Sequence, residues 1–291
     1  MDEQVFLNGR IVPAAEASVS VFDAGFTHAA GLFETLRAYN GRVMRLHEHA
    51  RRLADSAATL ELRIDVDEAA IEDGIDRLLK ANGLTEARIR WVMTPGDVPR
   101  PGQTLAGPIP QTTLITAIPV QGYPPELYEH GVRVCICPYK QNRLDPLAGH
   151  KTLSYLPRLL ANNDAAQRGC NEALWFTTDN MLAEGSMSNV FIVNGETLLT
   201  PPLKTPVLPG VVRGVVLELA ETEGIALEQR PIDIDALLDA DEVFLTGSMR
   251  EIMPVTAIEK HVVGEGTPGG MAKRLARLYK AQVNKECGIE R

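Results

Sequence analysis

Lys151 is the residue whose type and surroundings most directly suggest chemistry. It lies in Leu144-Asp-Pro-Leu-Ala-Gly-His-Lys-Thr-Leu-Ser-Tyr-Leu-Pro157, where turn-forming residues give way to an apolar, helix-compatible run from Thr152. The stretch predicts that Lys151 sits at a strand-to-helix junction among apolar residues. A desolvated ammonium has a lowered pKa, and the neutral amine can form a Schiff base with an aldehyde. Most lysines are surface charges, so this role needs support from other residues.

Two further side chains suit the same chemistry. Glu184 falls in Met181-Leu-Ala-Glu-Gly-Ser-Met-Ser-Asn-Val190, a predicted turn between two apolar strands. A carboxylate beside the pyridine nitrogen of a cofactor keeps that nitrogen protonated and makes the ring an electron sink. Tyr155 follows Lys151 by four residues and is predicted to face the same side on the following helix, with its phenol near the ring oxygen. Turn acids are more often solvated, and helix-face tyrosines more often belong to the core.

Three segments have donors for an anion such as phosphate. In Leu208-Pro-Gly-Val-Val-Arg213, a Pro-Gly pair precedes an amphipathic helix, so the N–H groups of Val211 and Val212 are expected at its positive end. Thr246-Gly-Ser-Met-Arg-Glu251 ends a predicted strand with hydroxyls on both sides of Gly247, and Ser248 supplies one of them. Arg52, on a predicted helix, would add the positive charge.

The composition argues against several classes of protein. The chain has 291 residues, of which 45% are hydrophobic and 23% charged, as in a globular protein with room for two domains. A net charge of −9 argues against a nucleic-acid-binding surface. No apolar run approaches the roughly 18 residues that span a membrane, and the acidic N-terminus lacks a secretory signal. The four cysteines have neither zinc-site nor Cys-x-x-Cys spacing, so we expect reduced thiols, no metal site and a cytoplasmic location.

Residues 1–120 are predicted to form a small N-terminal α+β domain. Asn8-Gly9 and Asn40-Gly41 each mark the turn of a β-hairpin, over residues 5–12 and 31–45. Helical spacing follows over 46–62 and 66–84. Further strands are expected at 87–93 and 112–118, on either side of a Pro- and Gly-rich loop at 94–110.

Residues 121–291 are predicted to form the larger domain, after a breaker-rich linker at 119–125. Strands are expected at 131–138 and 241–246, and a pair of buried strands at 172–177 and 189–193. Helices are expected at about 153–169, from just after Gly210 to about 224, and at about 269–284.

Together, these segments resemble the class IV, fold-type IV pyridoxal-phosphate enzymes. That family includes branched-chain and D-amino-acid aminotransferases and aminodeoxychorismate lyase. The segments that carry the resemblance follow one another along nearly the whole chain: Phe33-Glu-Thr-Leu-Arg-Ala-Tyr-Asn-Gly41, Arg45-Leu-His-Glu-His-Ala-Arg-Arg-Leu53, His150-Lys-Thr-Leu-Ser-Tyr155, Ala183-Glu-Gly-Ser-Met-Ser-Asn189, Leu208-Pro-Gly-Val-Val-Arg213 and Phe244-Leu-Thr-Gly-Ser-Met-Arg-Glu-Ile-Met-Pro-Val255.

The resemblance implies a two-domain α+β fold, with a small α/β domain before a larger mixed β domain with helices. It implies pyridoxal 5′-phosphate bound to Lys151, which also moves the proton between Cα and C4′. Glu184 would lie at the pyridine nitrogen and Tyr155 near the ring oxygen. The phosphate ligands it implies are Arg52, Val211, Val212 and Ser248, with Gly247 beside them. It also implies a homodimer whose subunits share active sites.

The subgroup stays open. Phe244-Leu-Thr-Gly-Ser248 and the Arg37 strand resemble branched-chain aminotransferases, which favours a branched-chain L-amino acid, a 2-oxo acid such as 2-oxoglutarate, and a ping-pong cycle. Ser154, where branched-chain enzymes tend to have Asn, favours aminodeoxychorismate lyase, which forms 4-aminobenzoate and pyruvate. A D-amino-acid or amine transaminase is a third alternative. A catalytically inactive binding homologue is the fourth, and the intact set of predicted cofactor residues argues against it.

Two kinds of side chain are candidates for binding the substrate. Arg37 and Arg90 alternate on predicted strands and Arg100 lies in the Pro- and Gly-rich loop, so each could bind a carboxylate. Apolar or flexible residues are candidates for the side-chain pocket: Phe26, Phe33 and Met249.

Overall fold

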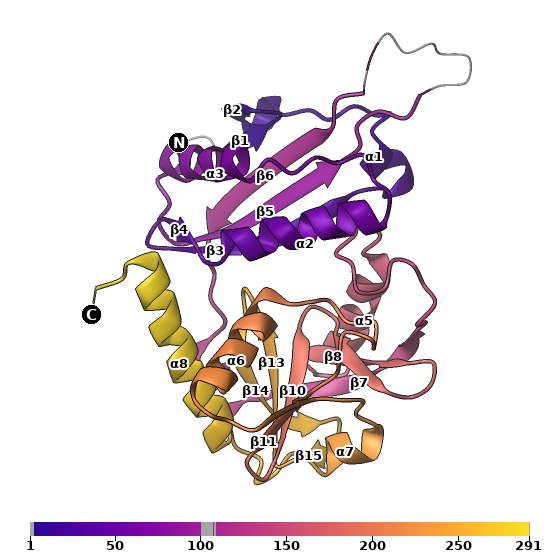
Figure 1. The fold of residues 1–291 in the computed structure, drawn as a ribbon, viewed down its shortest axis with the longest axis vertical. Coiled ribbons are helices and arrows are strands. Elements are labelled where there is room, and N and C mark those ends of the chain that lie inside the picture. The colour runs from indigo at the N-terminus through magenta and orange to yellow at the C-terminus, as the bar shows by residue number, and fades with distance from the viewer. Residues whose placement is uncertain (1–2, 100–106, 108, 291) are drawn as a thin grey trace. The chain divides into compact units, whose positions relative to one another are not determined.

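The computed structural model describes residues 3–99, 107 and 109–290, which form two compact units (Figure 1). Unit 1 consists of Met1–Gln121, Lys151–Ser154 and Val283–Arg291, and unit 2 of Gly122–His150 and Tyr155–Gln282. The division of the chain at residue 120 into separate domains stays a prediction. Most of the predicted loop at 94–110, including Arg100, lies outside the described residues.

Unit 1 contains a six-stranded sheet in which every neighbouring pair is antiparallel. Both predicted hairpins are confirmed, and the turn residues Asn8, Gly9, Asn40 and Gly41 all have the positive φ that a tight two-residue turn requires. The order across the sheet is β2 (Arg10–Pro13), β1 (Gln4–Leu7), β6 (Thr112–Pro119), β5 (Ala87–Thr94), β3 (Leu32–Tyr39), β4 (Arg42–Val43).

Two helices, α2 (Leu46–Thr59) and α3 (Glu68–Asn82), cover one face of this sheet (Figure 1). Their apolar stripes pack on alternate residues of the strands, such as Leu36 of β3 and Trp91 of β5. Asp67 caps α3 at its start by accepting a hydrogen bond from Ala70 N. The sequence did not predict the short elements η1 (Ala14–Glu16) and α1 (Ala24–His28).

Unit 2 contains a nine-stranded mixed sheet. The predicted strands at 172–177 and 189–193 are confirmed as β8 and β10, but they are not neighbours, because β8 pairs with β7 and β9 while β10 pairs with β11 and β13. The order is β12 (Leu227–Gln229), β11 (Thr197–Thr200), β10 (Asn189–Asn194), β13 (Glu242–Gly247), β14 (Glu251–Ile258), β7 (Val132–Gln141), β8 (Glu172–Thr177), β9 (Leu182–Gly185), with β15 (His261–Val262) paired to β14.

The sequence did not predict β14, a central strand, because it contains Pro254. Proline lacks the N–H that a central strand normally donates. Pro254 pairs with Phe244 of β13, and the register with β7 on the other side begins only at Val255. The missing N–H therefore need not interrupt a ladder of hydrogen bonds.

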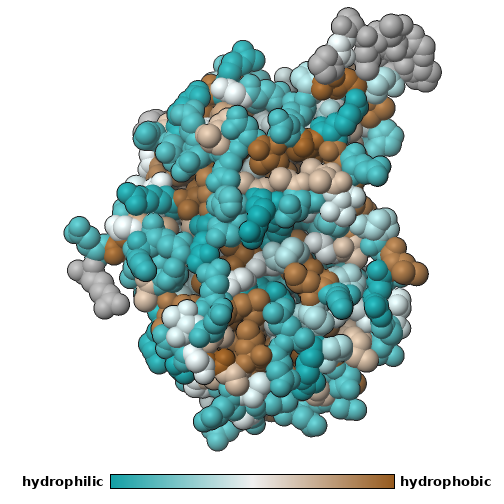
Figure 2. Space-filling view, viewed as in Figure 1, coloured by the Kyte–Doolittle hydropathy of each residue, from teal (hydrophilic) through white to brown (hydrophobic). Residues whose placement is uncertain are grey.

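Within the described residues, four helices lie in unit 2: α4 (Pro125–His130), α5 (Leu156–Gln167), α6 (Val211–Thr222) and α7 (Ile234–Leu238). A further helix, α8 (Gly270–Cys287), begins in unit 2 and continues past Val283, where the last segment of unit 1 starts. Helix α6 packs against β13, and α5 packs against β7 and β8. Within the described ranges, no helix has the length and apolar character needed to cross a membrane. Polar and apolar residues intermingle on the face in Figure 2, where polar residues predominate.

Candidate active site

An extended segment, not a helix, positions Lys151. Thr152 forms an isolated antiparallel bridge with Leu32, while Phe33 N donates to Lys151 O at 2.9 Å and Leu153 N donates to Gly31 O at 2.9 Å. Gly31 is required for this close pairing, because a Cβ there would lie 2.8 Å from the carbonyl oxygen of Met93 and 2.7 Å from Leu153 Cδ1. Paired residues of antiparallel segments project to the same face, so Lys151 lies on the face of β3 that carries Phe33.

Lys151 and Arg90 both lie over the ring of Phe33. The Lys151 amine is 4.5 Å and the Arg90 guanidinium carbon 3.2 Å from the ring centroid. Arg90 is held opposite Thr35, with 3.5 Å between Nη1 and the Thr35 hydroxyl. Arg37 lies on the same face, but its Cα is four strand positions from that of Phe33, about 13 Å along β3. Unit 1 therefore brings an amine, a cation and an aromatic ring together.

Arg52 lies in a buried charge cluster with Glu34 and His49, on the helix-covered face of β3. Its Nε and Nη2 donate to the two oxygens of Glu34 at 2.8 and 2.5 Å, and His49 Nδ1 lies 2.8 Å from Glu34 Oε2. Burial would raise the pKa of Glu34, but the charges and hydrogen bonds of Arg52 and His49 outweigh it and hold that pKa far below its usual value. Burial, partly opposed by Glu34, lowers the pKa of His49. The cluster fixes the position of Arg52, whose phosphate role stays a prediction.

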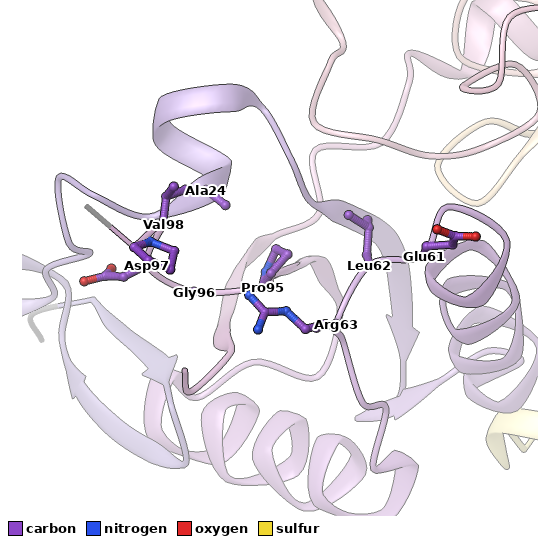
Figure 3. Close-up of a pocket in the computed structure, with 9 residues that line it drawn as sticks. Ala24, Glu61, Leu62, Arg63, Pro95, Gly96, Asp97 and Val98 are labelled. Atoms are coloured by element: carbon purple, nitrogen blue, oxygen red, sulfur yellow. The ribbon is translucent and has the colours of Figure 1, made fainter. Parts of the chain in front are cut away.

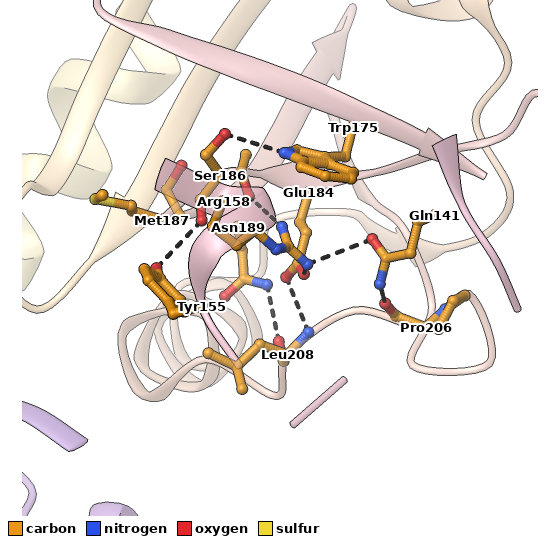
Figure 4. A network of polar contacts seen from close by, with 12 residues as sticks. Gln141, Tyr155, Arg158, Trp175, Glu184, Ser186, Met187, Asn189, Pro206 and Leu208 are labelled. Carbon is orange, nitrogen blue, oxygen red and sulfur yellow. Dashed lines mark hydrogen bonds and ion pairs between the residues drawn. The ribbon is translucent and has the colours of Figure 1, made fainter. Parts of the chain in front are cut away.

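Glu184 is in strand β9, not in the predicted turn, and is 5% exposed. The turn begins only after it, at Ser186, because β9 continues through Gly185 to pair with β8. Arg158 Nη2 donates to Oε1 of Glu184 at 2.6 Å, and Leu208 N donates to Oε2 at 2.9 Å (Figure 4). The carboxylate is thus fixed within unit 2.

Tyr155 is the N-cap residue of α5 and donates from its hydroxyl to Ser186 O at 3.3 Å (Figure 4). The prediction that Tyr155 follows Lys151 by about one turn of a helix was wrong, because Lys151 precedes the helix in an extended segment and α5 begins only at Leu156. The hydroxyl nevertheless contacts the turn that follows Glu184. Its proposed position near the ring oxygen stays a prediction.

The start of α6 has backbone donors and no side-chain cap. Gly210 is the N-cap residue and supplies no side chain to cap the first-turn N–H groups, which include those of Val211 and Val212. Glycine is needed there because a Cβ would lie 1.9 Å from Asn189 Oδ1. Asn189 Nδ2 in turn donates to Leu208 O at 2.8 Å. The same stretch of chain therefore links the helix start to Glu184.

The turn that carries Ser248 and Met249 lies next to the turn after Glu184. Asn189 of β10 pairs with Thr246 of β13, and a Cβ on Gly247 would lie 3.6 Å from Met187 O. The Thr246 hydroxyl is buried and has no hydrogen-bond partner within the part of the chain that the structure describes. The helix start without a side-chain cap and this buried hydroxyl fit an anion, and the carboxyl group of Glu184 fits a protonated ring nitrogen.

A buried ion pair that the sequence did not predict connects these two turns. Glu172 Oε1 accepts hydrogen bonds from Met187 N at 2.6 Å and from the Ser188 hydroxyl at 2.9 Å. Its Oε2 lies 3.0 Å from Arg250 Nη2, an ion pair outside hydrogen-bond geometry. Glu172 is fully buried, so this ion pair lies in the protein interior.

Replacing Glu172 with glutamine is expected to lower the free energy of unfolding by about 3 kcal/mol, because Arg250 then keeps a buried charge without its counterion. Urea unfolding of the cofactor-free protein measures the change. Glu228→Gln is the control, since Glu228 pairs with Arg230 at the exposed surface and its loss should cost less than about 1 kcal/mol. Equal effects of the two substitutions would contradict the role given to Glu172.

Other predicted residues lie apart from these groups. Phe26 on α1 is 76% exposed, and Arg100 is outside the described residues. A cavity of about 230 Å³ in unit 1, lined in part by Glu61, Arg63 and Asp97, contains none of the predicted site residues (Figure 3). In the described ranges, no cluster of His, Cys, Asp or Glu side chains could hold a metal ion.

The family model for class IV aminotransferases matches residues 31–258. The chain therefore belongs to the class IV aminotransferases and is a pyridoxal-phosphate-dependent enzyme with the two-domain, fold-type IV architecture. The predicted family, fold class, enzyme class and cofactor are confirmed. The residue roles at the cofactor and substrate stay predictions.

Several relatives are similar over nearly the whole chain. A provisionally named branched-chain-amino-acid aminotransferase of Methanocaldococcus jannaschii is 36% identical, over 99% of this chain and 98% of its own. D-alanine aminotransferase of Bacillus licheniformis is 32% identical, over 97% and 98%. The crystal structure of the Escherichia coli branched-chain amino acid aminotransferase has a TM-score of 0.89 at 28% identity, over 97% and 94%.

Proposed function

We propose that this enzyme transfers the amino group of a branched-chain L-amino acid to a 2-oxo acid such as 2-oxoglutarate by a ping-pong mechanism. The observation that carries the proposal is the placement of the Lys151 amine and the Arg90 guanidinium over one phenylalanine ring. The amine serves as base, the guanidinium suits a carboxylate, and the ring of Phe33 suits an apolar side chain. The names of the relatives support the substrate class.

Bound pyridoxal phosphate supplies an aldehyde and a ring that stores the electrons released at Cα. Lys151 Nζ would hold this cofactor covalently and, as a free amine, would move the proton between Cα and C4′. Glu184 would accept a hydrogen bond from the protonated ring nitrogen, and the Tyr155 hydroxyl would lie near the ring oxygen. The phosphate is assigned to Arg52, the N–H groups of Val211 and Val212, and the turn at Gly247 and Ser248.

We assign the substrate carboxylate to Arg90 and not to Arg37, because Arg90 and Lys151 both lie over the Phe33 ring. Arg37 instead lies over the ring of Tyr39, at 4.3 Å. Arg90→Gln is expected to lower kcat/KM about 10- to 100-fold, the loss of a charge-assisted hydrogen bond. Arg37→Gln is the matched control and should change kcat/KM less. Steady-state kinetics with L-leucine and 2-oxoglutarate measure both values. A larger loss of kcat/KM in Arg37→Gln than in Arg90→Gln would reverse the assignment.

The test of the substrate class is a half-reaction screen of the cofactor-loaded enzyme. L-leucine, L-isoleucine, L-valine and L-glutamate are expected to convert the visible cofactor spectrum to that of the pyridoxamine form. Faster conversion by D-alanine or by simple amines would favour a D-amino-acid or amine transaminase, as one relative's name suggests. Formation of 4-aminobenzoate and pyruvate from aminodeoxychorismate, with little conversion by L-leucine, would favour the lyase.

We also propose a cytoplasmic homodimer in which the pocket residue Phe26 comes from the partner subunit. Val21 and Phe26 are 65% and 76% exposed in the single chain, which supports an apolar surface that a second copy covers. All four cysteines are free thiols, as suits a reducing compartment. Analytical ultracentrifugation is expected to give a dimer, and a monomer that retains full activity would contradict shared sites.

A further inference from the structure

Arg158 is the side chain most closely bound to Glu184. Its Nη2 donates to Glu184 Oε1 at 2.6 Å, and its Nη1 donates to the carbonyl oxygen of Gly185 at 3.0 Å. Arg158 and Glu184 side chains are 20% and 6% exposed, so water screens their interaction little. One guanidinium therefore binds both the carboxylate and the backbone beside it.

The neighbours of Arg158 hold its guanidinium in place. Its central carbon lies 4.8 Å from the ring of Trp175, whose Nε1 donates to the Ser186 hydroxyl at 3.0 Å. Gln141 Oε1 lies 3.5 Å from Nη2 of Arg158, and its amide donates to the carbonyl oxygen of Pro206 (Figure 4). An arginine held on several sides loses little further freedom when it binds a carboxylate.

The position of Arg158 on α5 does not by itself account for a positively charged residue there. It is the third residue of the helix, in the first turn, where the helix dipole disfavours a positive charge. Tyr155 supplies no side-chain cap to that helix start. The stabilising partner of the charge is therefore Glu184 and not the helix.

Glu184 can accept a third hydrogen bond. A carboxylate has about four acceptor positions on its two oxygens, and Arg158 and Leu208 N occupy two of them. Arginine stays charged at every pH at which proteins are folded, so the guanidinium stabilises the negative charge of Glu184 throughout. In general, a cation within hydrogen-bond distance of a carboxylate opposes proton transfer to that carboxylate from a further donor.

We propose that Arg158 is a positioning residue that orients the Glu184 carboxylate and keeps the shared proton on the ring nitrogen of pyridoxal phosphate. This inference rests on the proposed role of Glu184 at that nitrogen. Arg158 thereby sets how well the ring withdraws electrons, without touching substrate.

The test compares Arg158→Gln and Arg158→Lys with the wild type, each loaded with pyridoxal phosphate labelled with nitrogen-15 in the ring. NMR of the wild type at neutral pH is expected to show a protonated ring nitrogen. In Arg158→Gln the resonance should move toward the unprotonated value, with kcat lowered about 10- to 100-fold and KM changed little, as expected when a charge-assisted contact is lost. Arg158→Lys should restore the resonance in part, because it keeps the charge but loses the two-donor geometry.

Arg168→Gln is the matched control. Arg168 ends the same helix, pairs with Glu259 and Asp164 at the surface, and lies ten residues, about 15 Å, further along. If the ring resonance of Arg158→Gln and Arg158→Lys equals that of the control, while the melting temperature of the cofactor-free protein falls, Arg158 is only structural and the inference is wrong. Failure of the wild type to bind the cofactor or to convert any L-amino acid would instead refute the proposed function.

Discussion

Lys151→Ala is expected to abolish the visible absorbance that covalent attachment of pyridoxal phosphate to the lysine gives. It should also lower kcat by about 10²- to 10⁴-fold or more, because a positioned proton-transfer group usually contributes a factor in that range. The segment around Lys151 is held by the backbone, through Phe33 N to Lys151 O and Leu153 N to Gly31 O. Alanine preserves both backbone hydrogen bonds, so the loss of absorbance and of activity is due to the missing amine and not to a displaced segment.

Lys140→Ala is the matched control for this substitution. Its amine lies 5.1 Å from the ring of Phe176, much as that of Lys151 lies over Phe33, but Lys140 has no proposed part in the reaction. Lys151→Arg adds a second comparison, because a guanidinium keeps the charge yet does not deprotonate to attack an aldehyde. Both Lys151 variants should lose the absorbance and the Lys140 variant should keep it. An unchanged spectrum in Lys151→Ala would remove Lys151 from the mechanism.

Local signals in the sequence were sufficient for much of the fold. Asn-Gly turns with positive φ defined the hairpins, and helical spacing of apolar residues located α2 and α3 to within a few residues. Short elements such as β9 and α1 have too few residues for a periodic pattern of apolar side chains to be recognised in the sequence. Strand β14 was missed for a different reason, since Pro254 is tolerated there only because β7 begins to pair one residue later.

The sequence showed which side chains could take part in the site, but it did not show which residues they contact. Glu34 binds Arg52 from 18 positions away, and Glu172 pairs with Arg250 across 78, so no spacing rule connects them. Lys151 was expected at a strand-to-helix junction, yet it lies in an extended segment that is held by the bridge between Thr152 and Leu32. A charged residue acquires its role from the element packed against it, and that packing follows from tertiary structure. Of these charged residues, Arg158 alone has an unusual position that can be read from the sequence. It lies in the first turn of a helix, where the helix dipole disfavours a positive charge.

The second large effect is expected at Glu34, where glutamine should lower the free energy of unfolding by about 3 to 5 kcal/mol. Glu34 is 1% exposed and binds Arg52 through both oxygens, so its loss leaves the Arg52 charge buried without a counterion. Urea unfolding of the cofactor-free protein measures this directly. Glu68→Gln is the matched control, because Glu68 and His47 also form a Glu–His pair at 2.9 Å, but an exposed one whose loss should cost less than about 1 kcal/mol.

The same cluster predicts how stability depends on pH. The folded-state pKa of His49 lies below its usual value of 6.5, so the unfolded chain binds that proton more readily and stability falls as the pH drops through 6.5. The folded-state pKa of Glu34 lies far below 4.5, so the stability it contributes is complete above pH 4.5 and is lost progressively below it. Unfolding free energies measured from pH 8 to pH 3 should therefore decline in two stages. In Glu34→Gln the decline below pH 4.5 should be smaller than in the wild type and in Glu68→Gln. If the unfolding free energy of all three proteins declined equally below pH 4.5, Glu34 would not be held ionised by Arg52 and His49.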